Sequence, residues 1–140
     1  MNRTAFKKLG RIAAATVLAT SALAAAGATS AQAASKDGVI NTGEFVQWYY
    51  TNYNGGCEDD YYGDSTFWND YFRNCGQGLS GVGQRVANNA ESDFNYDYSY
   101  SADVYTGVSY TGSHGVVLPR RGGNYTSTYK HHVESLRWHL

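Results

Sequence analysis

Histidines are the first residues to examine for catalysis, because they recur in hydrolase triads and metal sites. His114 stands in the segment GSHG, where a nearby serine and an Asp could complete a triad, but no GxSxG segment frames such a serine. His131, His132 and Glu134 could bind a metal, but the HExxH pattern is absent. We therefore predict that the protein is not an enzyme and requires no cofactor.

Side-chain oxygens that suit a hard cation such as calcium occur in two segments. Asn88, Asn89 and Ser92 belong to the segment NNAES, and loop carbonyls could complete a site there. The acidic run 58–60 and the nearby Asp64 lack the glycine and spacing of an EF-hand loop, so we expect a solvated loop. Imidazole suits calcium poorly, so we expect at most one weak calcium site.

The segment 1–33 has the three parts of a secretory signal peptide. Four basic residues precede an uncharged, Ala-rich run over 12–26, and Ala31-Gln32-Ala33 is a small-residue cleavage site. A membrane anchor is the alternative, but the apolar run is shorter than the roughly 18–20 residues that a span needs. We expect cleavage after Ala33, secretion, and no membrane attachment afterwards.

The rest of the chain, 34–140, is long enough for one modest core and predicts a single domain. Of the 11 Lys and Arg residues, four lie in the predicted signal peptide, so seven remain against 12 Asp and Glu. A net charge near −5 argues against nucleic acid or an anionic membrane as a partner. Large aliphatic residues are few, so aromatic side chains must supply much of the buried area. We expect a monomer.

Cys57 and Cys75 are the only cysteines. In an exported chain such a pair predicts one disulfide, which is worth about 3 kcal/mol in the loop-entropy model. A metal pair or a free nucleophile is the alternative, but neither a second CxxC nor a set of histidines at ligand spacing accompanies the two cysteines. We therefore expect a covalent link across this loop.

Two phrases of the sequence recur, which predicts two copies of one structural unit. The first phrase is an aromatic residue, a second aromatic five positions later, and a glycine two positions after that: Trp48, Tyr53 and Gly55, then Tyr105, Tyr110 and Gly112. The second phrase pairs NNAES at 88–92 with HHVES at 131–135. The copies span about 44–95 and 101–139. The two phrases lie further apart in the first copy than in the second, so the first copy carries a loop insertion.

Local composition favours β-strands throughout this region. Gly, Asn, Ser and Thr punctuate the chain at short intervals, and the segments 44–50, 96–105 and 124–130 are rich in Tyr, Val, Thr or Phe. Within the insertion, Phe67, Trp68, Tyr71 and Phe72 recur at helical spacing, which predicts one short helical turn. An all-β chain in two similar halves predicts two Greek-key motifs packed as a sandwich.

The repeated phrases resemble two motifs of the βγ-crystallins. The aromatic and glycine spacing resembles their folded-hairpin signature, and the second phrase resembles their calcium motif: two Asn/Asp, two variable residues, Ser/Thr, then Ser. Asn88, Asn89 and Ser92 fit that motif, but Asp93 replaces the final Ser. The resemblance implies a calcium site to which Ser135, from the other copy, contributes.

The overall layout, from about Asp37 to His139, resembles a secreted actinomycete family of metalloproteinase inhibitors with a βγ-crystallin fold. This resemblance implies a βγ-crystallin-like sandwich of two Greek-key motifs with one disulfide, and a secreted peptidase inhibitor, chiefly of metalloproteinases, that binds a secreted protease. No reactive bond of that family can be matched to this chain.

The disulfide-closed loop is the expected inhibitory surface. Its candidate contact residues are Tyr61, Tyr62, Trp68 and Tyr71, although we expect at least half of the loop's aromatic rings to fill the core. Two other functions stay open at this point: a calcium-binding βγ-crystallin-type module with a structural or stress role, and a secreted antimicrobial or toxin-like protein.

Overall fold

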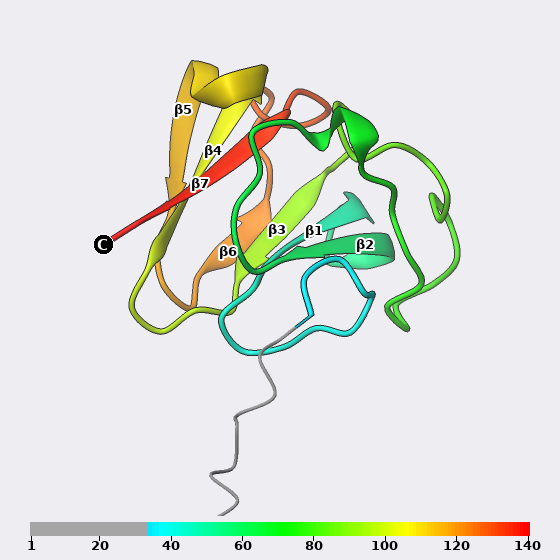
Figure 1. Ribbon diagram of the computed structural model, residues 1–140. Helices are drawn as coiled ribbons and strands as arrows, with labels where there is room; N and C mark the ends of the chain where they lie inside the picture. The colour runs from blue at the N-terminus through cyan, green and yellow to red at the C-terminus, as the bar shows by residue number, and fades with distance from the viewer. Residues whose placement is uncertain (1–33) are drawn as a thin grey trace, which may run out of the picture. The chain divides into compact units, whose positions relative to one another are not determined.

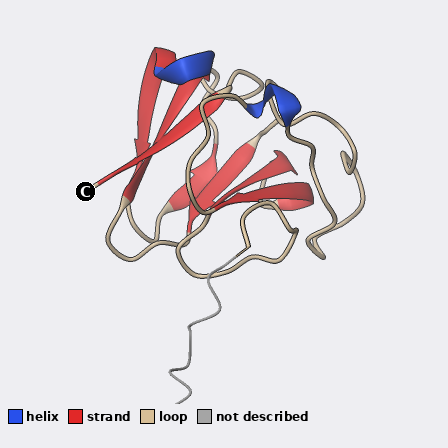
Figure 2. Ribbon diagram, in the orientation of Figure 1, coloured by secondary structure: helices blue, strands red, loops and turns tan. Residues whose placement is uncertain are grey.

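The computed structural model describes residues 34–140, which belong to one compact unit built from two antiparallel β-sheets (Figure 1). The strands are β1 (Phe45–Tyr50), β2 (Asn54–Asp60), β3 (Ser92–Asn95), β4 (Ser101–Gly107), β5 (Thr111–Val117), β6 (Gly122–Asn124) and β7 (Ser135–His139). The helical segments are two single 3-10 turns, η1 (Phe67–Asn69) and η2 (Val108–Tyr110) (Figure 2). The predicted signal peptide lies outside the described residues.

The two sheets exchange strands between the repeats. One sheet has the order β2-β1-β3-β6, and the other has the order β5-β4-β7. Strand β6 comes from the second repeat but pairs with β3 of the first. In return, Asp64 of the first repeat pairs with Leu136 of β7 through two backbone hydrogen bonds of 2.8 and 2.7 Å. Each repeat therefore completes a sheet of the other, as two interlocked Greek keys do.

Strand β1 is buried on both faces because both faces of its sheet are covered. Phe45 and the partly buried Tyr49 belong to the main core between the sheets. Val46 and Trp48 point the other way, into a smaller cluster with Cys57. The insertion also contributes two side chains to the main core, since Phe67 and Phe72 are 0% and 1% exposed.

The β1–β2 and β4–β5 hairpins are built alike. The Trp48 ring packs against Tyr53 with centroids 5.2 Å apart, and Tyr105 packs against Tyr110 at 5.9 Å. Gly55 and Gly112 follow with φ of +84° and +82°, a left-handed conformation that glycine adopts at little cost. A Cβ atom at Gly55 would also lie 2.7 Å from a backbone oxygen of the insertion.

The structure corrects three expectations about local elements. Segment 96–105 is a strand only from Ser101, because residues 96–100 form the loop between β3 and β4. The acidic run 58–60 is not a solvated loop, because it lies in β2 with all three side chains at most 1% exposed. Segment 124–130 is not a strand beyond Asn124, since turns follow β6, and its tyrosines Tyr125 and Tyr129 pack against the core from these turns. The predicted helical turn does occur, as η1.

No helix within residues 34–140 is both long enough and apolar enough to cross a membrane.

Candidate functional site

The insertion of the first repeat, residues 61–85 between β2 and the second repeated phrase, is fastened to strand β2. Cys57 and Cys75 form the predicted disulfide, with their Cα atoms 5.8 Å apart. Two backbone hydrogen bonds of 3.0 and 2.7 Å between Cys57 and Arg73 continue this attachment as an antiparallel bridge. The covalent link is therefore supported by strand-like pairing of the same two segments.

The second half of the insertion, residues 76–85, is held by further backbone hydrogen bonds. The N–H groups of Gly55 and Gly56 donate to carbonyls of this half at 2.9 and 2.8 Å. Phe72 exchanges hydrogen bonds with it as well, donating to Gln84 at 2.9 Å and accepting from Gly83 at 2.8 Å. Since the Phe72 side chain is buried in the core, the insertion is anchored from both sides.

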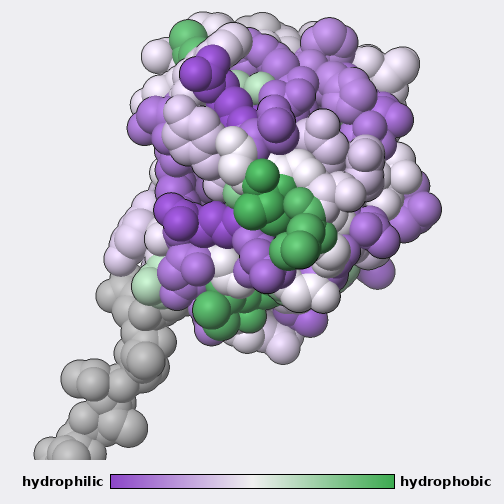
Figure 3. All heavy atoms as spheres, turned by 90° about the vertical axis from the view of Figure 1, so that its right-hand side faces the viewer, coloured by the Kyte–Doolittle hydropathy of each residue, from purple (hydrophilic) through white to green (hydrophobic). Residues whose placement is uncertain are grey.

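Four side chains that the insertion exposes define what we call the insertion face: Trp68, Tyr71, Leu79 and Val82, which are 43%, 50%, 70% and 40% exposed. Figure 3 shows an apolar patch surrounded by polar surface on the side of the molecule where the insertion lies. The guanidinium of Arg85 lies 5.0 Å above the Trp68 ring, and Arg85 also pairs with Tyr71 through a backbone bridge. The predicted contact residues Trp68 and Tyr71 therefore lie on one connected surface.

Tyr61 and Tyr62, also predicted to form the inhibitory surface, belong to a different place in the structure. Their rings pack edge to face at 5.1 Å and line a pocket together with Tyr100 and Trp138. The sequence could not separate the two groups, because all four predicted contact residues lie between positions 61 and 71.

Each folded hairpin is closed by a serine from the second repeated phrase. The Ser92 hydroxyl donates to the Tyr50 carbonyl at 2.7 Å and accepts from the Tyr53 N–H at 3.2 Å. The Ser135 hydroxyl donates to the Gly107 carbonyl at 2.6 Å and accepts from the Tyr110 N–H at 3.1 Å. The second phrase of each repeat thus secures the hairpin formed by the first phrase.

This arrangement agrees with two solved structures. A domain solved in a study of the evolution of the eye lens βγ-crystallin domain fold aligns with a TM-score of 0.56 and 12% identity, over 72% of this chain and 89% of that chain. The fold is βγ-crystallin-like. The N-terminal domain of protein S aligns with a TM-score of 0.50 and 17% identity, over 69% of this chain and 94% of that chain. No family model matches the chain, and no match was found among curated proteins.

In this βγ-crystallin-like domain the proposed calcium ligands have other contacts. Ser92 and Ser135 are fully buried, and their hydroxyls are occupied by the two hairpins, which counts against calcium ligation by either. The Asn89 amide donates to the carbonyls of Arg85 and Ala87, so it stabilises its own loop. The predicted calcium site therefore gains no support from this geometry.

Two glutamates of the repeated phrases instead connect the repeats, a role that we did not predict. The Asn88 amide donates to Glu134 at 2.6 Å, and at the equivalent position the His131 ring lies 2.8 Å from the Glu91 carboxylate. Burial acts to raise the pKa of Glu91, but Lys130 and His131 hold it below its usual value. The signal was present in the sequence, since both phrases carry Glu at the same place.

A lysine occupies the centre of a buried acidic cluster. The Lys36 ammonium donates to the carboxylates of Asp64 and Asp70, the latter at 2.8 Å, and lies 3.9 Å from Asp60. Burial raises the pKa of Asp70 to about 6. Burial also acts to raise the pKa of Asp64, but the hydrogen bonds with Lys36, Thr66 and Asp70 and the charge of Lys36 together hold it below its usual value. Glu58 is fully buried with both carboxylate oxygens unpaired, and burial raises its pKa well above the usual value. Lys36 thus supplies the positive charge at the centre of this cluster.

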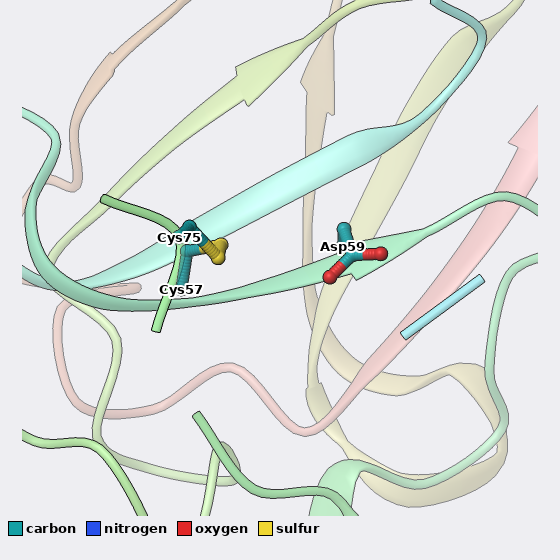
Figure 4. A group of neighbouring side chains, drawn as sticks. All are labelled: Cys57, Asp59 and Cys75. Atoms are coloured by element: carbon teal, nitrogen blue, oxygen red, sulfur yellow. A yellow bond between two sulfur atoms is a disulfide. The ribbon is translucent and has the colours of Figure 1, made fainter. Parts of the chain in front are cut away.

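Cys57, Asp59 and Cys75 form the one group of three potential metal ligands found within residues 34–140 (Figure 4). Their chemistry excludes a metal site, because both sulfurs are consumed by the disulfide. The Asp59 carboxylate accepts the backbone N–H groups of Asp37 and Gly38 at 3.0 and 2.8 Å. Asp59 therefore fixes residues 37 and 38 to β2, while the disulfide fixes residue 75 to the same strand.

The histidine considered for a triad contacts a buried aspartate instead. His114 Nε2 lies 3.3 Å from Asp103, which is also 2.7 Å from His139 Nδ1, and the His114 ring stacks on Tyr105 at 4.8 Å. Asp103 lies on β4, and His114 of β5 and His139 of β7 are its diagonal cross-strand neighbours. Only the register of the three strands reveals this placement. The contacts of His114 are therefore those of a cross-strand cluster, not of a catalytic serine.

A cavity of about 370 Å³ lies between strands β5 and β6, with Asp93 in its wall. The Asp93 side chain is only 4% exposed, and burial raises its pKa to about 7 although hydrogen bonds with Tyr125 and Gly123 act in the opposite direction. Asp93 is therefore a buried group that titrates near neutral pH.

Proposed function

We propose that this protein is a secreted peptidase inhibitor that binds its target through the insertion face, with metalloproteinases as the expected class of target. The observation that carries the proposal is the insertion itself. It belongs to the first repeat alone, it is held rigidly, and it exposes Trp68, Tyr71, Leu79 and Val82. The resemblance of the chain's layout to secreted metalloproteinase inhibitors supports the same function.

Rigidity matters because an inhibitor loop that is ordered before binding loses little conformational entropy when it binds. The disulfide and the backbone hydrogen bonds from Gly55, Gly56 and Phe72 provide this order. Trp and Tyr are the residue types that most often dominate binding energy, and clustered exposed apolar side chains mark interaction surfaces. The insertion face combines both properties.

The first test measures inhibition directly. The purified secreted protein is assayed against metallo-, serine and cysteine proteases with peptide substrates, over nanomolar to micromolar concentrations. We expect dose-dependent inhibition of at least one metalloproteinase at a one-to-one ratio. The protease should not degrade the inhibitor completely during the assay. Absence of inhibition across the panel would reject the proposal.

The second test locates the surface. Trp68→Ala combined with Tyr71→Ala should weaken inhibition at least about 30-fold, since each truncation of a central aromatic costs about 1 kcal/mol or more. Leu79→Ser should weaken it independently. The matched control is Tyr98→Ala combined with Val116→Ala, because these side chains are 69% and 48% exposed but lie outside the insertion.

Melting temperatures of all variants establish that folding is retained. Inhibition that survives both insertion variants would place the binding surface elsewhere, with the GSHG turn and the hairpin at Arg120 and Arg121 as the next segments to substitute.

A further inference from the structure

A second pocket, of about 210 Å³, is lined mainly by aromatic side chains. Its walls comprise three tyrosines, one tryptophan, one aspartate and one glycine: Tyr61, Tyr62, Tyr100, Trp138, Asp97 and Gly43. These residues come from the end of β2, the loop between β3 and β4, strand β7, and the turn before β1. The pocket is separate from the residues of the insertion face.

The two tyrosines that follow β2 are fixed by their backbone. The N–H of Tyr62 and that of Gly63 donate to one oxygen of the buried Asp60 at 3.0 and 2.8 Å, and the N–H of Tyr61 donates to the Ser35 hydroxyl at 3.0 Å. The Tyr61 and Tyr62 rings meet at 76°, so they form two nearly perpendicular walls. The corner exists before any ligand binds.

Asp97 fixes its own loop and still offers a free oxygen. Its Oδ1 atom accepts the N–H groups of Ser99 and Tyr100 at 2.6 and 2.7 Å, which also positions Tyr100. Its Oδ2 atom makes no hydrogen bond with any described residue and lies 3.7 Å from where a Cβ atom of Gly43 would be. A side chain at position 43 would lie 2.9 Å from the Tyr61 ring, so glycine keeps this corner open.

Aromatic faces beside a carboxylate are suited to an organic cation. The protein already uses such contacts elsewhere: the guanidiniums of Arg85, Arg120 and Arg137 lie over aromatic rings at 5.0 Å from Trp68, 4.8 Å from Tyr98 and 5.7 Å from Tyr105. No Lys or Arg is among the six residues that line this pocket. The net negative charge of residues 34–140 favours a cationic ligand further.

We propose that this pocket binds the quaternary ammonium group of a small molecule, with choline as the simplest probe. A primary ammonium is strongly hydrated and carries three N–H donors, for which the pocket offers one free carboxylate oxygen. A trimethylammonium group has no donors to satisfy, and its methyl groups carry positive charge toward aromatic faces. Four rings and one carboxylate therefore match a quaternary group better than a primary one.

The test is an NMR titration of the ¹⁵N-labelled secreted protein at constant ionic strength. Trp138 provides the reporter, because its indole Nε1 is buried and makes no hydrogen bond with the described residues. We expect choline chloride to shift this indole signal saturably in the millimolar range. The neutral isostere 3,3-dimethylbutan-1-ol has the same shape without the charge, and it should bind at least about fivefold more weakly.

Two variants and one control connect binding to the pocket. Asp97→Asn keeps an oxygen for the loop hydrogen bonds but removes the charge, and Tyr100→Leu removes one ring; each should weaken choline binding at least about fivefold. The matched control is Tyr98→Leu, since Tyr98 lies in the same loop but outside the pocket and should leave binding unchanged.

Several outcomes would overturn the proposal: no saturable shift at Trp138, equal binding of the neutral isostere, or choline binding unaffected by Asp97→Asn and Tyr100→Leu. Sedimentation with phosphatidylcholine vesicles distinguishes a lipid head group from a free onium compound as the source of the same chemistry. Because none of these variants lies on the insertion face, protease inhibition can fail while onium binding succeeds, and the reverse.

Discussion

Buried Asp93 should make this domain more stable in mild acid than at slightly alkaline pH. Its folded-state pKa is raised from 3.8 to about 7 by burial, so the folded protein binds this proton more tightly than the unfolded chain. The resulting contribution to stability is fully present below about pH 4 and is lost as the pH rises through about 7. Glu44 and Asp70, with pKa values raised by burial to about 7 and about 6, act in the same direction.

The size of the effect follows from the pKa difference. Raising one carboxyl from 3.8 to about 7 corresponds to about 4 kcal/mol in total, since one pKa unit is about 1.4 kcal/mol. Between pH 5 and about pH 7 the folded protein keeps this proton whereas the unfolded chain has lost it, so the free energy of unfolding falls over two pKa units. We therefore expect Asp93 to lower the free energy of unfolding by about 2–3 kcal/mol between pH 5 and pH 8. In a domain of this size that is roughly 10 °C in melting temperature.

The assay is urea unfolding at half-unit steps from pH 5 to pH 8, for the unmodified protein and for Asp93→Asn. Asn is similar in shape and does not titrate, so the variant should lose about 2–3 kcal/mol of the pH dependence and keep the part from Glu44 and Asp70. Ser135→Ala is the control, because it removes a fully buried group that does not titrate, so it should lower the free energy of unfolding by the same amount at every pH. Identical pH slopes for the protein and Asp93→Asn would refute the reasoning.

The remaining predictions concern the repeats, the acidic cluster and calcium. Gly55→Ala and Gly112→Ala should each cost about 1–2 kcal/mol in chemical denaturation, because both positions have positive φ and an added Cβ atom would lie 2.7 Å from Ser80 O or 2.5 Å from Thr106 Oγ1; a neutral effect at either glycine would contradict this. Ser135→Ala should cost about 1–3 kcal/mol by leaving hairpin groups unpaired, whereas a neutral effect would remove its role. Lys36→Gln should cost about 1–3 kcal/mol at pH 7 and less at pH 5, as the acidic groups protonate; a pH-independent cost would speak against the cluster. Millimolar calcium should leave the melting temperature within about 1 °C of that in chelator, because the serine hydroxyls are already occupied; a larger saturable shift would restore the calcium site.

The fold could be predicted because its requirements are local. An aromatic pair at fixed spacing and a glycine that needs positive φ mark each hairpin, and two copies of that signal indicate two Greek keys. The disulfide followed from there being one pair of cysteines in a chain with a signal-peptide pattern. These features depend on backbone geometry and covalent chemistry, which a single sequence records directly.

The sites could not be predicted as well because they depend on long-range contacts. Ser92 matches a calcium motif in sequence, but only the three-dimensional structure shows that its hydroxyl closes a hairpin. The acidic run 58–60 reads as a polar loop, although Lys36, which is distant in the sequence, allows part of it to be buried. Asp103 and its two histidines meet only through the register of three strands.

The exchange of strands between the repeats has a consequence for the order of folding during synthesis. The first repeat emerges first, yet its sheet has an unpaired edge on β3 until β6 is made, and the backbone of Asp64 has no partner until β7, the last strand described, arrives. Neither half can therefore complete its hydrogen bonding alone. The two sheets can therefore be completed only once nearly all of residues 34–140 is available, and a chain that stops before β6 would leave the edge of β3 open to pairing with other chains.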